Sequence, residues 1–214
     1  MIYCISDIHG EYDRYIAMLE QINLSDDDTL YVLGDVIDRG DRGIDILFDI
    51  MERPNVKMLL GNHEYMCLAT LGPNNEIGMR DIWQHNGGGV TYNDLMFTRS
   101  IKDRMKVLRF IESLPDHLDI EVNGRVFHLV HGCPGDNLHD RIWGRPDPYA
   151  GAPVDGATVI VGHTPTAYLA GDHGEPFRIW HGNGIVDIDC GCGNKTDKRR
   201  LACLRLDDLE EFYC

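Results

Sequence analysis

The stretch Gly34-Asp35-Val36-Ile37-Asp38-Arg39-Gly40 decides the fold of this 214-residue chain, because it directly follows a short apolar run, residues 29–33, with the character of a buried strand. Two similar runs, residues 1–6 and 56–60, also end at polar, glycine-containing segments. Residues 12–22 and 44–51, between these runs, have apolar side chains at helical spacing. The first third of the chain therefore predicts a βαβαβ unit with parallel strands and a ligand site beyond their carboxyl ends.

The rest of the chain changes in character. Residues 72–115 combine glycine-rich turns with a helical stretch at 101–114, which predicts a helical insertion or cap. Short strands are predicted at 118–122, 125–131, 158–161, 177–180, 185–188 and 201–206. Asn123-Gly124 predicts a tight hairpin between the first two. A parallel half followed by a mostly antiparallel half indicates two packed sheets with helices outside, in a single domain covering residues 1–214.

Composition limits the classes of partner. The chain has 20 Lys+Arg against 35 Asp+Glu, a net charge of −15, and such an acidic surface repels nucleic-acid backbones and anionic membranes. The segment MIYCISDIHG lacks the features of a signal peptide, and no apolar run reaches the length of a membrane span. The seven cysteines show no Cys-x-x-Cys spacing. We therefore expect a cytoplasmic monomer with reduced thiols and with no nucleic-acid or membrane partner.

Five short segments collect side chains suited to binding a metal ion. They are Asp7-Ile8-His9-Gly10, Gly34-Asp35-Val36-Ile37-Asp38-Arg39-Gly40, Gly61-Asn62-His63-Glu64, His131-Gly132 and Gly162-His163-Thr164-Pro165. Each segment alone fits a turn or a helix cap. All five, however, follow predicted strands and place a glycine beside Asp, Asn or His, where the chain turns sharply and an ion can approach. Carboxylate, amide and imidazole donors without thiolates indicate borderline divalent ions such as Mn, Fe, Co or Zn rather than a structural zinc.

These segments resemble, in the same order, the signature of the metal-dependent phosphoprotein phosphatases, within the calcineurin-like metallophosphoesterases: GD-x-HG, GD-x-x-DRG, GNHE, HG and GH-T-P. The resemblance covers about residues 2–206. Asn86-Gly87-Gly88-Gly89 and Ile142-Trp143-Gly144-Arg145 look most like the small bacterial and phage serine/threonine protein phosphatases. Ser6 stands where Gly commonly precedes the first Asp, and Cys133 stands where Gly or Ala is common. The resemblance implies an α/β fold, a four-layer αββα sandwich of two mixed sheets with helices outside.

The resemblance also implies a cofactor of two divalent metal ions, with Mn preferred and Fe, Zn, Co or Ni as alternatives. The ligands that it implies are Asp7 and His9 for one ion, Asn62, His131 and His163 for the other, and Asp35 as a bridge between them. In the family's mechanism a hydroxide that bridges the two ions attacks phosphorus.

Further roles follow from the same resemblance. His63 would protonate the leaving alkoxide, and Asp38 would orient its imidazole ring. Arg39 and Arg145 would bind the non-bridging phosphate oxygens, a task that suits planar bidentate donors, and Asn62 would also face the substrate.

These roles predict a phosphomonoesterase that acts on phosphoserine and phosphothreonine, and in a broader form on phosphotyrosine, in proteins or peptides, with inorganic phosphate as product. One alternative is a diadenosine tetraphosphate hydrolase, because these enzymes carry nearly the same signature, although they are typically longer. A 2′,3′-cyclic phosphodiesterase is a third possibility. An alternative of another class is a non-catalytic, metal-dependent scaffold, but degenerate relatives usually lose ligands and none is missing here.

Overall fold

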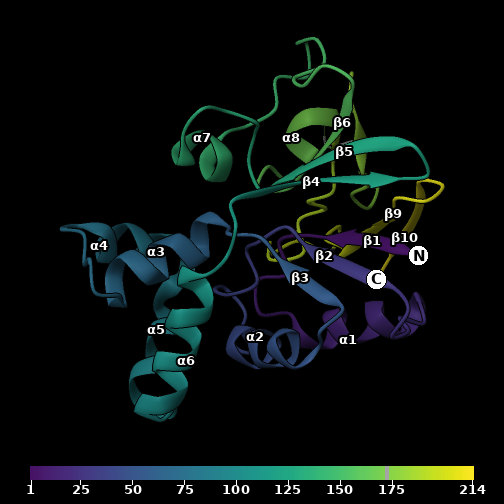
Figure 1. Ribbon diagram of the computed structural model, residues 1–214. Coiled ribbons are helices and arrows are strands. Elements are labelled where there is room, and N and C mark those ends of the chain that lie inside the picture. The colour runs from purple at the N-terminus through teal and green to yellow at the C-terminus, as the bar shows by residue number, and fades with distance from the viewer. Residues whose placement is uncertain (172–173) are drawn as a thin grey trace.

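Two five-stranded sheets lie face to face in the computed structural model, which describes residues 1–171 and 174–214 (Figure 1). In spatial order the first sheet contains β10 (Glu210–Tyr213), β9 (Ala202–Arg205), β1 (Ile2–Ile5), β2 (Thr29–Val32) and β3 (Val56–Met58). The second contains β4 (His117–Val122), β5 (Arg125–Val130), β6 (Ala157–Val161), β8 (Ile185–Asp187) and β7 (Trp180–His181). Both sheets mix parallel and antiparallel neighbours, which confirms the predicted α/β sandwich of two mixed sheets.

The predicted βαβαβ unit is present at the start of the chain. Helices α1 (Tyr12–Gln21) and α2 (Gly43–Glu52) connect β1, β2 and β3, which run parallel, and both helices lie on the outer side of the first sheet (Figure 1). Alternation along β1 explains this packing: Tyr3 and Ile5 belong to the core under the helices, whereas Cys4 faces the core between the sheets.

The second half of the chain is mostly antiparallel in its strand pairing, as expected: β4, β7, β9 and β10 are antiparallel to their neighbours. The centre of the second sheet differs from this expectation, because β5, β6 and β8 run parallel. Parallel neighbours need crossover connections, and these contain α7 (Leu138–Trp143) and α8 (Ala167–Ala170). The β4–β5 hairpin is confirmed: Asn123 and Gly124 have φ angles of 52° and 76°, as its tight turn requires.

Helices fill most of the segment between β3 and β4. In chain order they are α3 (Asn62–Leu71), α4 (Met79–Trp83), the π-helical turn η1 (Gln84–Gly88), α5 (Gly89–Asn93), a second π-helical turn η2 (Asp94–Thr98) and α6 (Ile101–Glu112). Helix α6 packs against α2 and α3, and the group projects beyond the edge of the first sheet (Figure 1).

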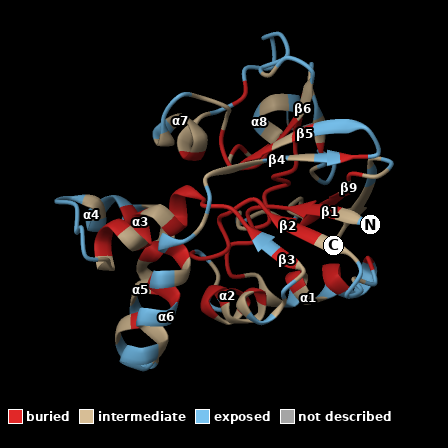
Figure 2. Ribbon diagram, viewed as in Figure 1, coloured by how far each residue is buried: buried red, intermediate tan, exposed pale blue. Residues whose placement is uncertain are grey.

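Burial is concentrated in the strands and in the loops that follow them (Figure 2). These loops and the start of α3 hold an unusual number of buried polar side chains, including Asp7, Asp35, Asn62, His63 and His131. Burying a polar group is costly unless it has a partner, so such a concentration marks a functional site. No helix among residues 1–171 and 174–214 has the length and apolar character needed to cross a membrane.

Candidate metal centre and active site

The side chains predicted as metal ligands meet between the carboxyl ends of four strands and the start of α3. Asp7 and His9 follow β1, Asp35 follows β2, and Asn62 begins α3; from the second sheet, His131 follows β5 and His163 follows β6. Two overlapping groups have ligand atoms within 4.8 Å of one another: His9, Asp35 and His63, and Asp35, His131 and His163. Asp35 belongs to both groups, which is the position that a bridging ligand would take.

The second group is arranged like a cation site. The Nε2 atom of His131 and the Nδ1 atom of His163 lie 3.0 and 2.9 Å from the Oδ1 atom of Asn62. His131 must carry its proton on Nδ1, because that atom lies 2.8 Å from the carbonyl oxygen of Leu33, which only accepts. The Nε2 atom of His131 therefore faces Asn62 Oδ1 and, at 3.3 Å, a carboxylate oxygen of Asp35, a position for either a proton or a bound cation. Acceptors facing acceptors at these distances need a positive charge between them.

The pKa values in this group point the same way. Burial lowers the pKa of His131, but the carboxylates around it, Asp35 first, outweigh burial and raise it to about 10. Burial and the neighbouring His131 lower the pKa of His163 to about 3, so this imidazole is neutral and has a lone pair to offer. The site thus attracts one positive charge strongly, and the donor set suits a borderline divalent ion.

His9, in the first group, and the neighbouring Asp7 are oriented by hydrogen bonds. His9 Nδ1 donates to the carbonyl oxygen of Ile37 at 3.0 Å, which turns Nε2 toward Asp7 and Asp35, at 3.9 and 3.8 Å. The hydroxyl of Ser6 donates to Asp7 Oδ2 at 2.5 Å, and the backbone N–H of His163 donates to the same oxygen. The departure from glycine at position 6 thus adds a hydrogen bond that orients Asp7.

Backbone strain is concentrated at these loops. Nine non-glycine residues among the described ones have positive φ, and six of them are candidate site residues: Asp7, His9, Asp35, Asp38, Arg39 and His163. Such conformations cost roughly 1–3 kcal/mol each and persist only where the surrounding structure imposes them. The strained turns point side chains from separate strands back toward one centre.

Glu64 fixes the loop after β2. Its carboxylate accepts hydrogen bonds from the backbone N–H groups of Asp35 and Val36, at 2.8 and 2.9 Å, and from those of Ile37 and Gly61. Burial, together with the charge of Asp35, raises the pKa of Glu64 to about 7. Glu64 therefore positions Asp35 through its backbone and does not face the pocket.

His63 and Asp38 form a buried pair. The Nδ1 atom of His63 lies 2.6 Å from Asp38 Oδ2 and must donate to it, which leaves Nε2 facing the pocket, 3.8 Å from Asp35 Oδ2. Burial lowers the pKa of His63, but Asp35 and Asp38 outweigh burial and raise it overall. A raised pKa favours the protonated imidazole that a proton donor requires.

Two residues that hold Asp38 were missed by the sequence analysis. The indole Nε1 of Trp83 donates to the same Asp38 oxygen at 2.7 Å, and the backbone N–H of Asp38 donates to the hydroxyl of Thr91 at 3.0 Å. The run Asn86–Gly89 carried the signal: a Cβ on Gly88 would lie 2.3–2.6 Å from atoms of the Trp83 ring, so only glycine leaves room for the indole.

The two arginines line one pocket with the ligands. This pocket has a volume of about 180 Å³, and its walls include Asp35, His63, Arg39 and Arg145. Arg39 donates to Asn194 at 3.4 Å and also lies 3.5 Å from His63 Nε2, Arg145 donates to Thr164 at 3.2 Å, and neither arginine forms an ion pair with a described carboxylate. Both guanidinium groups are therefore available to an anion.

Other residues that line the pocket had no role assigned from the sequence. Asn194, Tyr168 and the buried Asp189 carried no motif, whereas Asn86 belongs to the quoted segment Asn86–Gly89. Cys133, by contrast, is not among its lining residues, and burial raises the pKa of its thiol to about 12, so the thiol stays protonated at neutral pH.

The fold and the site together define a metallophosphoesterase. The family model of the calcineurin-like phosphoesterases matches residues 1–188, and the chain belongs to this family. Over 69 residues it is 42% identical to the symmetrical bis(5′-nucleosyl)-tetraphosphatase of Salmonella typhimurium; the match covers 31% of this chain and 24% of that relative, so the chain matches about a quarter of its length.

Solved structures agree on the fold. A protein serine/threonine phosphatase from Saccharomyces cerevisiae superposes with a TM-score of 0.65 at 14% identity, over 100% of this chain and 78% of that one. A metallophosphoesterase from Sphaerobacter thermophilus superposes with a TM-score of 0.61 at 19% identity, over 99% and 86% of the two chains. At these identities the likeness establishes the architecture alone.

Proposed function

We propose that this metallophosphoesterase is a phosphomonoesterase that hydrolyses phosphoserine and phosphothreonine, and more broadly phosphotyrosine, in proteins or peptides and releases inorganic phosphate. The observation that carries the proposal is the pairing of His63 with Asp38 on the wall of the pocket that also holds the metal-ligand atoms and two arginines without an ion pair to any described carboxylate. A proton donor beside an anion site suits cleavage of an ester whose alkoxide must be protonated as it leaves.

The donor set fits divalent ions, with Mn as the ion we propose and Fe, Zn, Co or Ni as alternatives. Asp7 and His9 would hold one ion, and Asn62, His131 and His163 the other, with Asp35 shared. Ions bound there supply Lewis-acid stabilisation of the phosphate oxygens and activate water as the nucleophile.

The chain's own residues perform the remaining steps. Arg39 and Arg145 bind the non-bridging oxygens and set the phosphate in the pocket. His63 then passes the proton on Nε2 to the leaving oxygen, and its Nδ1–H stays on Asp38, whose charge stabilises the protonated ring until that transfer.

Hydrolysis of dinucleoside polyphosphates is the second candidate, because the curated relative from Salmonella typhimurium carries that activity in its name. A direct comparison separates the two. With Mn²⁺ added, we expect release of phosphate from phosphoserine and phosphothreonine peptides with a kcat/KM at least about tenfold above that for diadenosine tetraphosphate. The reverse ratio would replace the first proposal with the second.

A non-catalytic scaffold is tested in the same experiment. We expect hydrolysis of p-nitrophenyl phosphate that depends on added Mn²⁺ and is lost on chelation with EDTA. Absence of turnover in protein that elemental analysis shows to be metal-loaded would favour the scaffold.

Replacing Trp83 with phenylalanine tests how Asp38 is positioned. The variant removes one of two hydrogen bonds to the Asp38 carboxylate, and we expect kcat for phosphopeptides to fall about tenfold, the order expected for a hydrogen bond to a charged group. The fall should be smaller for p-nitrophenyl phosphate, because p-nitrophenolate needs little protonation as it leaves. Trp180→Phe, in β7, is the matched control. Equal losses for both substrates would show that Trp83 acts on the fold alone.

A further inference from the structure

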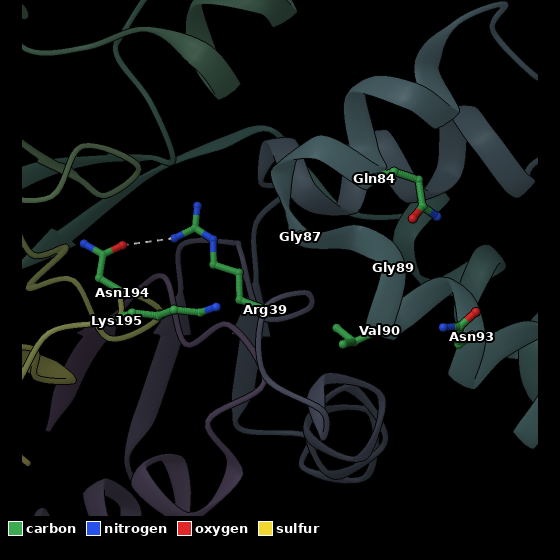
Figure 3. A pocket seen from close by; sticks show the side chains of 9 residues that line it. Arg39, Gln84, Gly87, Gly89, Val90, Asn93, Asn194 and Lys195 are labelled. Carbon is green, nitrogen blue, oxygen red and sulfur yellow. Dashed lines mark hydrogen bonds between the residues drawn. The ribbon is translucent and has the colours of Figure 1, made fainter.

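A second cleft opens beside the phosphate pocket. It has a volume of about 620 Å³ and lies between the helical segment around η1 and α5 and the loop at residues 193–195 (Figure 3). Arg39 and Asn194 line both the cleft and the phosphate pocket, so the two spaces adjoin at this hydrogen-bonded pair. A group attached to a phosphate held by Arg39 therefore lies next to the cleft.

The phosphate pocket and the cleft differ in volume, and each suits a different part of the substrate. Sites for small organic ligands measure roughly 300–1,000 Å³, a range that includes the cleft and excludes the phosphate pocket at about 180 Å³. The inner pocket thus suits the phosphoryl group, and the adjoining cleft is large enough for the remainder of the substrate.

The walls of the cleft suit a peptide better than a nucleoside. Gln84 and Asn93 on the helical side and Asn194 on the loop side present amides that both donate and accept, as peptide backbone does (Figure 3). None of the described residues that line the cleft is aromatic, whereas recognition of unpaired bases commonly relies on stacking against aromatic rings.

The loop side of the cleft is positively charged. Lys195 is exposed there, on the same side as Arg39, and neither side chain forms an ion pair with a described carboxylate (Figure 3). In a chain of net charge −15, an acidic peptide is repelled over most of the surface. Two unpaired cations next to the phosphate pocket reverse that repulsion locally.

We propose that this cleft binds the residues that flank the phosphorylated side chain, and that Lys195 selects an acidic residue among them. The inference rests on the proposed function and adds a preference to it. Arg39 holds the phosphate at the inner end, and Lys195 pairs with a carboxylate farther along the peptide.

The test is a set of phosphoserine peptides that carry glutamate, alanine or lysine at each of the three positions on either side of the phosphoserine. We expect the wild-type protein to prefer glutamate over alanine at one or more positions, and Lys195→Glu to lower that ratio of kcat/KM about tenfold. Lys195→Gln should lower it about threefold. The wild-type preference should also weaken as salt rises, because exposed charges are screened. Lys102→Glu, an exposed lysine on α6, is the matched control and should leave the ratio unchanged.

The outcomes separate this inference from the proposed function. Wild-type hydrolysis of phosphopeptides with no preference for glutamate, or with a preference that the Lys195 variants keep, overturns the inference and leaves the function standing. No hydrolysis of any phosphopeptide, with rapid cleavage of diadenosine tetraphosphate, overturns both.

Discussion

Asp35→Asn is expected to lower kcat/KM for phosphopeptides by about a thousandfold or more. Asp35 is the one residue common to both groups of potential ligands, and its Oδ2 lies 3.3 Å from His131 Nε2 and 3.8 Å from His9 Nε2. Asparagine keeps the shape of the side chain but removes its charge. It also keeps an oxygen that can accept from the backbone N–H of His63, which lies 3.0 Å from Asp35 Oδ1 in the wild-type protein. Lewis-acid stabilisation is worth several kcal/mol, and each 1.4 kcal/mol or so is a factor of ten in rate.

The measurement pairs steady-state kinetics with elemental analysis of metal content. The expected result is a variant with native circular dichroism, reduced metal content and almost no turnover. Asp26→Asn, at an exposed position in the turn before β2, serves as the control for loss of one negative charge. Turnover within about tenfold of wild type at unchanged metal content would remove Asp35 from the centre.

The second large effect is expected from His63→Asn, and its size should depend on the leaving group. General acid catalysis contributes roughly 100- to 10,000-fold. We expect a loss in this range for phosphoserine peptides, whose alkoxide is a poor leaving group, and a loss below about tenfold for p-nitrophenyl phosphate. The geometry supports this difference, since His63 is fixed through Nδ1 by Asp38 at 2.6 Å and turns Nε2 toward the pocket.

A series of aryl phosphates with leaving groups of graded basicity measures the difference. The dependence of kcat on leaving-group basicity should be steeper in His63→Asn than in wild type. His139→Asn, with a side chain that is 79% exposed, is the matched control. Parallel lines for variant and wild type would mean that His63 does not donate the proton and acts only through binding.

Much of this molecule was predictable from local signals. The βαβαβ unit and the Asn123-Gly124 hairpin were found because strand length, helical spacing and turn chemistry are all encoded within a few neighbouring residues. The order of strands in the second sheet was not predictable in this way. The crossover through α7 lies in a segment rich in Pro and Gly, a composition that is typical of a loop. Strand β10 was also missed, because the charged residues Glu210 and Glu211 give this edge strand a polar sequence.

In the site too, some residues could be predicted from the sequence and others could not. The six ligand candidates lie together in space as the sequence motifs implied, since each follows a strand that ends at the same place. Their roles as ligands stay predictions. Trp83 and Thr91 were out of reach because each meets Asp38 across roughly fifty residues of chain and carries no motif of its own. The one sequence signal was the glycine run, in which Gly88 leaves room for the Trp83 ring.

Because both sheets contribute residues to the site, activity depends on how the two sheets are docked. Asp35 and Asn62 are carried by connections of the first sheet, and His131 and His163 by those of the second. Any partly melted form in which the sheets separate pulls the constellation apart, even if each sheet stays intact. Turnover therefore requires the two sheets to be docked on each other, because the residues that one sheet carries form only part of the centre.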